Sequence, residues 1–185
     1  TNANWQHNAT TGSMMWGPPY SAADLWHQSS VKSGDTKPGA GAVGSAWRYA
    51  NPIAGNYETP GFANAGVLQT RNTISIGDDN KLTFWTWYDG ELDFWPDRKL
   101  VEVSTDGINW QPVAWRAQFW PPFMPPDITP AQFNSLTSVP PRVWTKVEAS
   151  LANYAGEDIY LRFRFDTMDD WSNNFEGWYL DDVSI

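Results

Sequence analysis

Cysteine is absent from the 185-residue sequence. Its absence excludes disulfide frameworks, zinc–thiolate sites, iron–sulfur clusters and cysteine nucleophiles. Histidine occurs only at His7 and His27 and there is no HExxH motif, which excludes a zinc site built on that motif. A GxSxG nucleophile elbow is also missing. Because the common catalytic motifs are lacking, we expect the chain to have no enzymatic activity of its own.

Basic residues are scarce as well. The sequence has 12 Lys and Arg residues against 21 Asp and Glu residues, a formal net charge of −9 at pH 7 with a pI near 4.5. Such a charge disfavours binding to nucleic-acid phosphates and to anionic membranes, and favours hard cations. No apolar run is long enough for a transmembrane helix. We therefore expect neither a nucleic-acid partner nor a membrane span.

Tryptophan, glycine and proline are plentiful, with 13, 14 and 14 residues. The aromatic residues fall mostly in short runs of alternating apolar and polar residues, separated by Gly, Pro, Asn and Asp, which is typical of β-strands. The length suits one domain. We predict that residues 1–185 form a single all-β domain, a two-sheet antiparallel β-sandwich of about ten short strands with the topology of a jelly roll.

The chain divides into strands and loops along its length. Residues 1–46 are expected to be mostly ordered coil, with one strand at Asp24–Gln28. The dipeptide Asp106-Gly107 between two alternating runs predicts a β-hairpin. The runs Tyr160–Phe165 and Gly177–Ile185, joined by an acidic loop, predict a closing pair of antiparallel strands.

A proline-rich insertion occupies residues 118–142. Its prolines exclude central strands. Within it, Thr129-Pro130 has the pattern of a helix cap with proline at the first helical position, which predicts a short helix over Ala131–Leu136.

Two adjacent aspartates, Asp181 and Asp182, lie inside the last predicted strand. Side chains of a strand alternate between faces, so we expect one of the two carboxylates to point toward the core. An unpaired buried charge costs several kcal/mol or more. We therefore expect that carboxylate to be neutralised, hydrogen-bonded or bound to a cation.

A set of short segments, taken in order, resembles a known family. The segments are Leu25-Trp26-His27, Trp47-Arg48-Tyr49, Asn64–Leu68, Leu82-Thr83-Phe84, Val103–Gly107, Tyr154-Ala155-Gly156, Arg162–Thr167 and Glu176–Val183. They resemble the jelly-roll module appended to immune inhibitor A-type secreted bacterial metallopeptidases, and are similar to MAM and cleaved-adhesin domains, over residues 24–185. The resemblance implies an extracellular, non-catalytic module of the galactose-binding or MAM-like type, with calcium near its last strand and a neighbouring domain of the same polypeptide as a partner.

Calcium ligands are expected among the acidic residues, because calcium accepts carboxylates and carbonyls in the irregular geometry that loops supply. The candidates are Asp182, Asp181, Glu91 and Asp97. The alternative is that these acids are solvated loop residues. Paired carboxylates could also serve a glycosidase if they lay about 5–10 Å apart.

Two functions therefore remain after the sequence is considered. The first is a calcium-stabilised accessory or adhesion module of a secreted bacterial protein, in which the aromatic residues fill the core and a cell-surface protein or glycan is a possible partner. The second is a carbohydrate-binding module, in which Trp95, Trp120 and Phe123, beside prolines in predicted loops, are platforms for sugar rings. Exposed rings along a groove would favour the second function, and buried rings the first.

Overall fold

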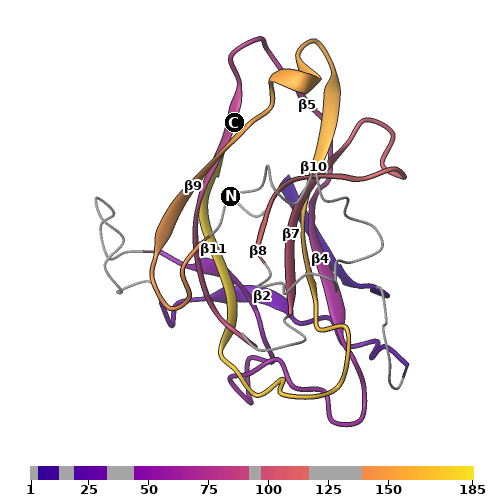
Figure 1. Ribbon diagram of the computed structural model, residues 1–185, viewed down its shortest axis with the longest axis vertical. Coiled ribbons are helices and arrows are strands. Elements are labelled where there is room, and N and C mark those ends of the chain that lie inside the picture. The colour runs from indigo at the N-terminus through magenta and orange to yellow at the C-terminus, as the bar shows by residue number, and fades with distance from the viewer. Residues whose placement is uncertain (1–3, 13–18, 33–43, 92–96, 117–138) are drawn as a thin grey trace, which may run out of the picture.

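The chain folds into two antiparallel β-sheets that face each other, as the computed structural model of residues 4–12, 19–32, 44–91, 97–116 and 139–185 shows (Figure 1). The first sheet contains, in spatial order, β1 (Trp5–Ala9), β4 (Ala65–Thr70), β10 (Asp158–Asp166), β7 (Arg98–Ser104) and β8 (Gln111–Arg116), and β5 (Ile74–Ser75) also pairs with β10. The second contains β2 (Trp26–Ser29), β3 (Ala46–Tyr49), β11 (Gly177–Ser184), β6 (Lys81–Asp89) and β9 (Thr145–Ser150). The predicted all-β two-sheet sandwich is confirmed.

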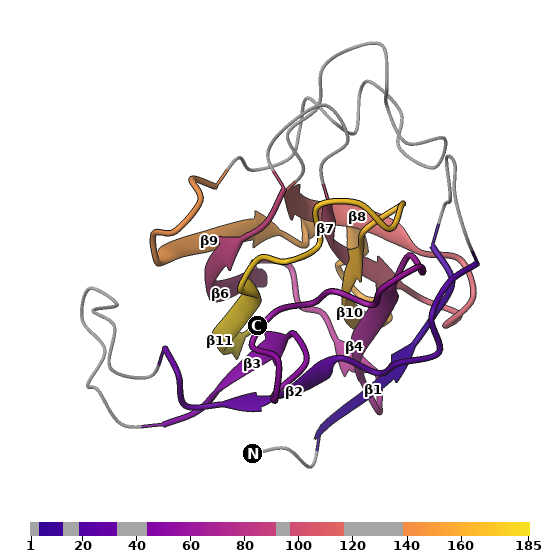
Figure 2. The same ribbon diagram turned by 90° about the horizontal axis from the view of Figure 1, so that it is seen from below.

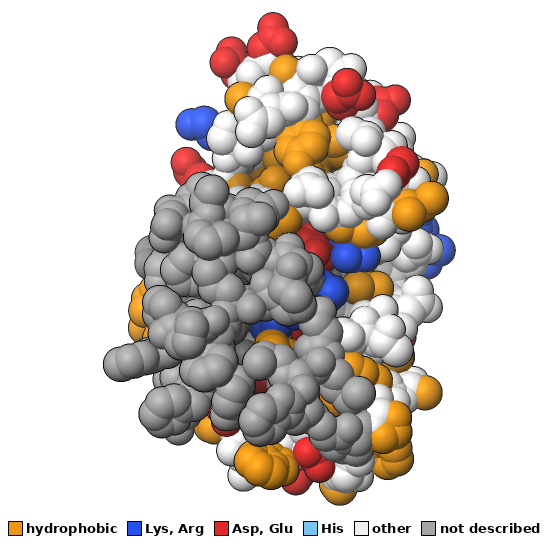
Figure 3. Space-filling model, turned by 45° about the vertical axis from the view of Figure 1, so that its right-hand side comes forward, with side chains coloured by type: hydrophobic (Ala, Val, Ile, Leu, Met, Phe, Trp, Pro, Cys, Tyr) orange, Lys and Arg blue, Asp and Glu red, His pale blue; other side chains and the backbone are white. Residues whose placement is uncertain are grey.

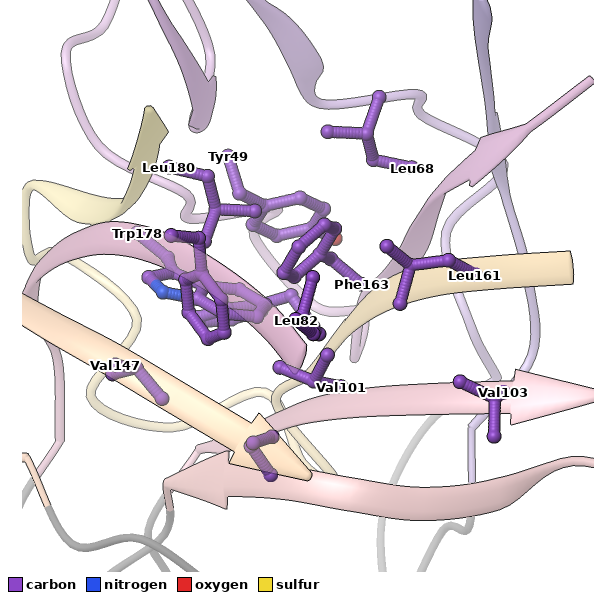
Figure 4. Close-up of a cluster of buried hydrophobic side chains, with 14 of the residues drawn as sticks. Tyr49, Leu68, Leu82, Val101, Val103, Val147, Leu161, Phe163, Trp178 and Leu180 are labelled. Atoms are coloured by element: carbon purple, nitrogen blue, oxygen red, sulfur yellow. The ribbon is translucent and has the colours of Figure 1, made fainter. Parts of the chain in front are cut away.

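The core lies between the two sheets and follows from the alternation of each strand. Leu82 and Phe84 of β6 point inward, as do Trp178 and Leu180 of β11, and they meet side chains such as Phe163 from the opposite sheet (Figure 4). The rings of Phe84 and Phe163 lie 5.2 Å apart, edge to face. Each such side chain contributes about 1.5–3 kcal/mol by burial, which is why these short strands hold together without disulfides.

A second aromatic cluster covers the outer face of the second sheet. It is formed by Trp87, Trp144 and Tyr179 with Ala46, and Trp85 packs against it. Tyr179 is fully buried, and its ring lies 5.4 Å from that of Trp87. These rings pack against one another outside the core between the two sheets, which is where aromatic filler was expected.

The predicted hairpin at Asp106-Gly107 is confirmed, since β7 and β8 pair antiparallel on either side of it. Gly107 has a φ of +72°, a left-handed conformation that glycine adopts at little cost. The Asp106 carboxylate accepts hydrogen bonds from the backbone N–H groups of Asn109 and Ile108, at 2.7 and 2.8 Å. These bonds stabilise the ionised carboxylate and lower the pKa of Asp106.

The predicted pairing of the last two strands is wrong. β10 pairs with β4, β5 and β7 of the first sheet, whereas β11 pairs with β3 and β6 of the second. Residues 167–176 cross from one sheet to the other, seen at the bottom of Figure 1. Hairpin loops usually have two to five residues, so a connection of this length favours a crossover.

The N-terminal region differs from the prediction too. β1 was expected to be coil, but it pairs with β4 from Trp5↔Thr70 to Ala9↔Gly66. Its sequence, WQHNA, has weak alternation, and its strand conformation depends on the backbone ladder that β4 provides. The short helix predicted over residues 131–136, with most of the insertion, lies outside the described residues.

Candidate functional site

An open seam between the two sheets is the candidate site. β1 is the last strand of the first sheet and β2 is the last strand of the second, and they lie side by side at one edge of the sandwich (Figure 2). A groove of about 590 Å³ runs along this seam, and we call it the edge groove. It is lined by Trp5, Gln6, His7 and Asn8 of β1, Trp26, His27 and Gln28 of β2, Trp47 of β3, and Arg71 beyond β4.

Two polar contacts fix the backbone around the edge groove. His7 Nδ1 lies 2.7 Å from Asp24 Oδ2, which links β1 to the segment that precedes β2. Arg71 Nε donates a hydrogen bond of 2.8 Å to the carbonyl oxygen of Trp5. The His7 contact therefore links the first sheet to the second, whereas the Arg71 contact lies within the first sheet and fixes β1 beside the end of β4.

Three indole rings line the edge groove, and they differ in environment. The half-buried ring of Trp5 packs on the core ring of Phe163 at 5.8 Å, and the ring of Trp47 meets the edge of His7 at 5.5 Å. Trp26 is buried, and its Nε1 has no hydrogen-bond partner among the described residues. A buried N–H without an acceptor costs about 1–3 kcal/mol.

Burial of the His27 side chain favours the neutral form of its imidazole. It is half-buried, with Nδ1 at 3.1 Å from the carbonyl oxygen of Leu25. Burial penalises the charged ring and lowers the pKa of His27, against the opposing effect of this hydrogen bond. Because a carbonyl oxygen only accepts, Nδ1 carries the hydrogen of the neutral ring and donates it to Leu25, which leaves Nε2 as a hydrogen-bond acceptor.

The edge groove therefore combines aromatic carbon surface with groups that both donate and accept hydrogen bonds. Gln6, Asn8 and Gln28 each offer an amide N–H₂ and a carbonyl oxygen. Concave sites of about 300–1,000 Å³ with apolar walls and a few polar groups are typical of small-molecule binding. The chemistry of this groove fits a ligand with many hydroxyl groups and apolar faces.

The predicted calcium ligands lie in two separate places. Asp97 is buried, and one of its oxygens accepts hydrogen bonds from the Tyr57 hydroxyl and, at 2.9 Å, from the backbone N–H of Glu91. Lys99 Nζ lies 4.0 Å from the same oxygen. Burial raises the pKa of Asp97 to about 6, opposed by the charge of Lys99 and the Tyr57 hydrogen bond. Glu91 and Asp97 are thus neighbours.

The expectation that Asp181 or Asp182 faces the core is wrong. The register of β11 on β6 shifts between Asp181 and Ser184, and Asp182 has a φ of +48°. This β-bulge interrupts the alternation, so Asp182 is exposed while Val183, which follows it, packs against the core. Because the bulge adds one residue to β11, neither Asp181 nor Asp182 places its carboxylate in the core.

The two acidic pairs do not converge on one ion. Asp181 pairs with Trp85, whereas Glu91 lies beyond Asp89, the partner of Gly177. Trp85 and Asp89 are four residues apart on β6, which corresponds to about 13 Å along the strand. Among the described residues, no group of three or more Asp, Glu or His side chains is placed to hold a metal ion. The four residues therefore do not converge on a single calcium site, and calcium binding stays a prediction.

The aromatic residues that the sequence analysis selected as ligand platforms differ from those that line the edge groove. Trp95, Trp120 and Phe123 lie outside the described residues. Trp5, Trp47 and the polar residues of β1 were not recognised as a site, because their convergence depends on strand pairing. Trp171, an exposed residue of the acidic loop between β10 and β11, was not singled out either.

Charged side chains on the outer face of the first sheet neutralise one another. Figure 3 shows basic and acidic side chains together on one face of the molecule. Glu102 of β7 accepts a hydrogen bond of 2.6 Å from Arg162 and lies 3.4 Å from Arg164, both on β10. The guanidinium of Arg162 also lies 4.0 Å from the ring centre of Trp110. This network stabilises the sheet face by pairing its charges.

Comparisons with known proteins give structural matches only. No protein-family model matches the sequence. No curated protein matches it. A cleaved adhesin domain of Lys-gingipain from Porphyromonas gingivalis matches with 16% identity and a TM-score of 0.48, over 98% of this chain and 90% of that one. Two carbohydrate-binding modules also match, each with 12% identity.

The first of these modules belongs to the β-sandwich superfamily and was described for its promiscuous specificity. It has a TM-score of 0.52, and the match covers 100% of this chain but 57% of the module's chain. The second, TmCBM61, was solved with β-1,4-galactotriose and has a TM-score of 0.46, over 98% of this chain and 86% of that one. At this identity, the match with a TM-score of 0.52 shows a shared β-sandwich fold and nothing further. No described helix has the length and apolarity needed to cross a membrane.

Proposed function

We propose that this domain is a non-catalytic binding module that holds a carbohydrate chain in the edge groove. The observation that carries the proposal is the convergence of half-buried indole rings with amide and imidazole groups in one groove of about 590 Å³. The indole rings offer apolar surface to the C–H faces of a sugar, and the amides match its hydroxyl groups.

The wider context of the proposal is an extracellular bacterial protein. It is supported by the resemblance of the terminal segment, Glu176–Val183, to modules of immune inhibitor A-type metallopeptidases and to cleaved-adhesin domains. In this context the module would attach a neighbouring domain of the same polypeptide to a glycan surface. Adhesion and accessory roles then have the same physical basis, which is sugar binding at the edge groove.

Calorimetric titration of the 185-residue domain tests the proposal. The ligands are neutral β-linked galacto-, xylo- and cello-oligosaccharides of two to six units. We expect at least one series to bind, and the double substitution Asn8→Ala with Gln28→Ala to weaken binding at least about tenfold, or about 1.4 kcal/mol. Both residues are exposed, so the variant should remain folded.

Asn153→Ala is the matched control, because Asn153 is an exposed amide in the short turn η2 (Ala152–Tyr154) and does not line the groove. It should bind as the unmodified domain does. Failure of every oligosaccharide series to bind would contradict the proposal. Equal weakening by the groove variant and by Asn153→Ala would place the binding site elsewhere and contradict it as well.

A further inference from the structure

Trp171 is the most exposed aromatic side chain among the described residues. It retains 69% of its accessible surface, and it lies in the loop of residues 167–176 that crosses between the sheets. Indole rings are usually buried in monomeric proteins, and contact sites for partners are enriched in tryptophan. A ring placed in solvent at one end of the sandwich therefore calls for a functional explanation.

The loop holds the backbone of Trp171 in one conformation. The Asp169 carboxylate accepts a hydrogen bond of 2.9 Å from the backbone N–H of Trp171. The Asp169 carbonyl oxygen accepts bonds from Thr167 Oγ1 at 2.8 Å and from Asn173 Nδ2 at 3.1 Å. Met168, whose side chain is buried, anchors the start of the loop. Binding through a pre-organised loop loses little conformational entropy.

The acidic residues on the N-terminal side of Trp171 have no basic partner among the described residues. Asp169 and Asp170 are both half-buried, and neither pairs with a Lys, Arg or His side chain in the described part of the structure. Asp166, three residues earlier, differs, because its carboxylate lies 3.5 Å from Arg98. Burial, together with the charge of Asp170, raises the pKa of Asp169.

A third acceptor lies in the same loop. Asn173 is 2% exposed, and its Oδ1 has no hydrogen-bond partner among the described residues. Within two residues of Trp171 the loop thus carries two carboxylates without a basic partner among the described residues and one unsatisfied carbonyl oxygen. Each of these groups is stabilised by a positively charged hydrogen-bond donor.

We propose that Trp171, with Asp169 and Asp170, binds a lysine or arginine side chain of a protein partner. Ammonium and guanidinium groups are attracted to the face of an indole ring, and carboxylates at its side add charge-assisted hydrogen bonds. A hard metal ion would use the oxygens but not the ring, and a neutral sugar would use the ring but leave the carboxylates uncompensated. The net charge of −9 would steer a basic partner toward the domain.

The test is an NMR titration of the domain with an acetylated and amidated nonapeptide of alternating Lys and Gly. The indole N–H signal of Trp171 is identified as the one that disappears in Trp171→Ala. We expect the Lys peptide to shift this signal, the same peptide with Glu in place of Lys to leave it unchanged, and added salt to weaken the effect. Trp171→Ala and Asp170→Asn should each lower the affinity at least fivefold, with little change in Tm because both side chains are outside the core.

Asp79→Asn is the matched control, since it changes the net charge by the same amount as Asp170→Asn. Asp79 lies in an exposed turn, distant in sequence from Trp171. Its affinity for the Lys peptide should stay near that of the unmodified domain. Equal weakening by Asp79→Asn and Asp170→Asn would show that only overall charge matters, and would overturn the proposal. A Trp171 signal that responds to neutral oligosaccharides or to calcium chloride, but not to the Lys peptide, would overturn it too. None of these outcomes depends on the edge groove, so the two proposals fail separately.

Discussion

Replacing Asp97 by Asn should change how the stability of the domain depends on pH. Asp97 is buried, and its burial raises its pKa from the ordinary value of 3.8 to about 6. The folded state therefore binds this proton more tightly than the unfolded state does. The contribution of the group is fully present below pH 3.8 and is lost as the pH rises to about 6, because ionisation is then less favourable in the folded state.

The expected size of the change follows from the two pKa values. Each pH unit between 3.8 and about 6 corresponds to about 1.4 kcal/mol, so the unmodified domain should lose about 3 kcal/mol through Asp97 over this range. Asn does not titrate and lacks this loss. The variant also leaves Lys99, 4.0 Å from Asp97, without its carboxylate partner, but that cost is nearly constant over this pH range.

Urea unfolding followed by tryptophan fluorescence, at intervals from pH 4 to pH 7.5, provides the measurement. The other acids titrate in both proteins, so the difference in free energy of unfolding isolates Asp97. We expect the unmodified domain to lose stability relative to Asp97→Asn as the pH rises. Parallel curves would refute the raised pKa. A relative gain in stability would show that attraction to Lys99 outweighs burial.

The remaining predictions concern backbone conformation and calcium. Gly177→Ala should prevent folding or destabilise it severely, since the new Cβ would lie 2.1 Å from the carbonyl oxygen of Tyr49 at a φ of +100°. Gly55→Ala, with a φ of +75° and open space around it, should cost only about 1–2 kcal/mol, and circular dichroism melting of the two variants checks both expectations. Asp182→Gly should leave stability unchanged or raise it by up to about 1 kcal/mol, because glycine adopts the left-handed conformation of Asp182 freely. A loss of about 2.7 kcal/mol in calcium at a hundredfold excess over its Kd, absent in chelator, would instead identify Asp182 as a calcium ligand.

Local features of the sequence were enough to predict much of the secondary structure. The alternation at Lys81–Tyr88 and at Tyr160–Phe165 corresponds to β6 and β10, because a strand with one face in the core needs side chains of period two. Asp106-Gly107 identified its hairpin for an equally local reason, the left-handed conformation of Gly107. β1 was missed because its alternation is weak and its partner strand lies about sixty residues away in the chain.

The candidate site, in contrast, could not be predicted from local features of the sequence. Residues of the edge groove come from β1, β2, β3 and the segment after β4, and only the order of strands in the two sheets brings them to one seam. The bulge at Asp182 likewise depends on its pairing with β6, which overrides the alternation that the sequence suggests.

The sequence by itself determined that this chain is all-β, acidic and free of the common catalytic motifs, because these properties depend on composition and on neighbours in the chain. The tertiary structure alone decided which strands share a sheet, where the alternation breaks at Asp182, and which aromatic rings line a groove or, like Trp171, stay in solvent. The physical reason is that burial and strand pairing are long-range: each depends on residues that approach only after the two sheets have packed.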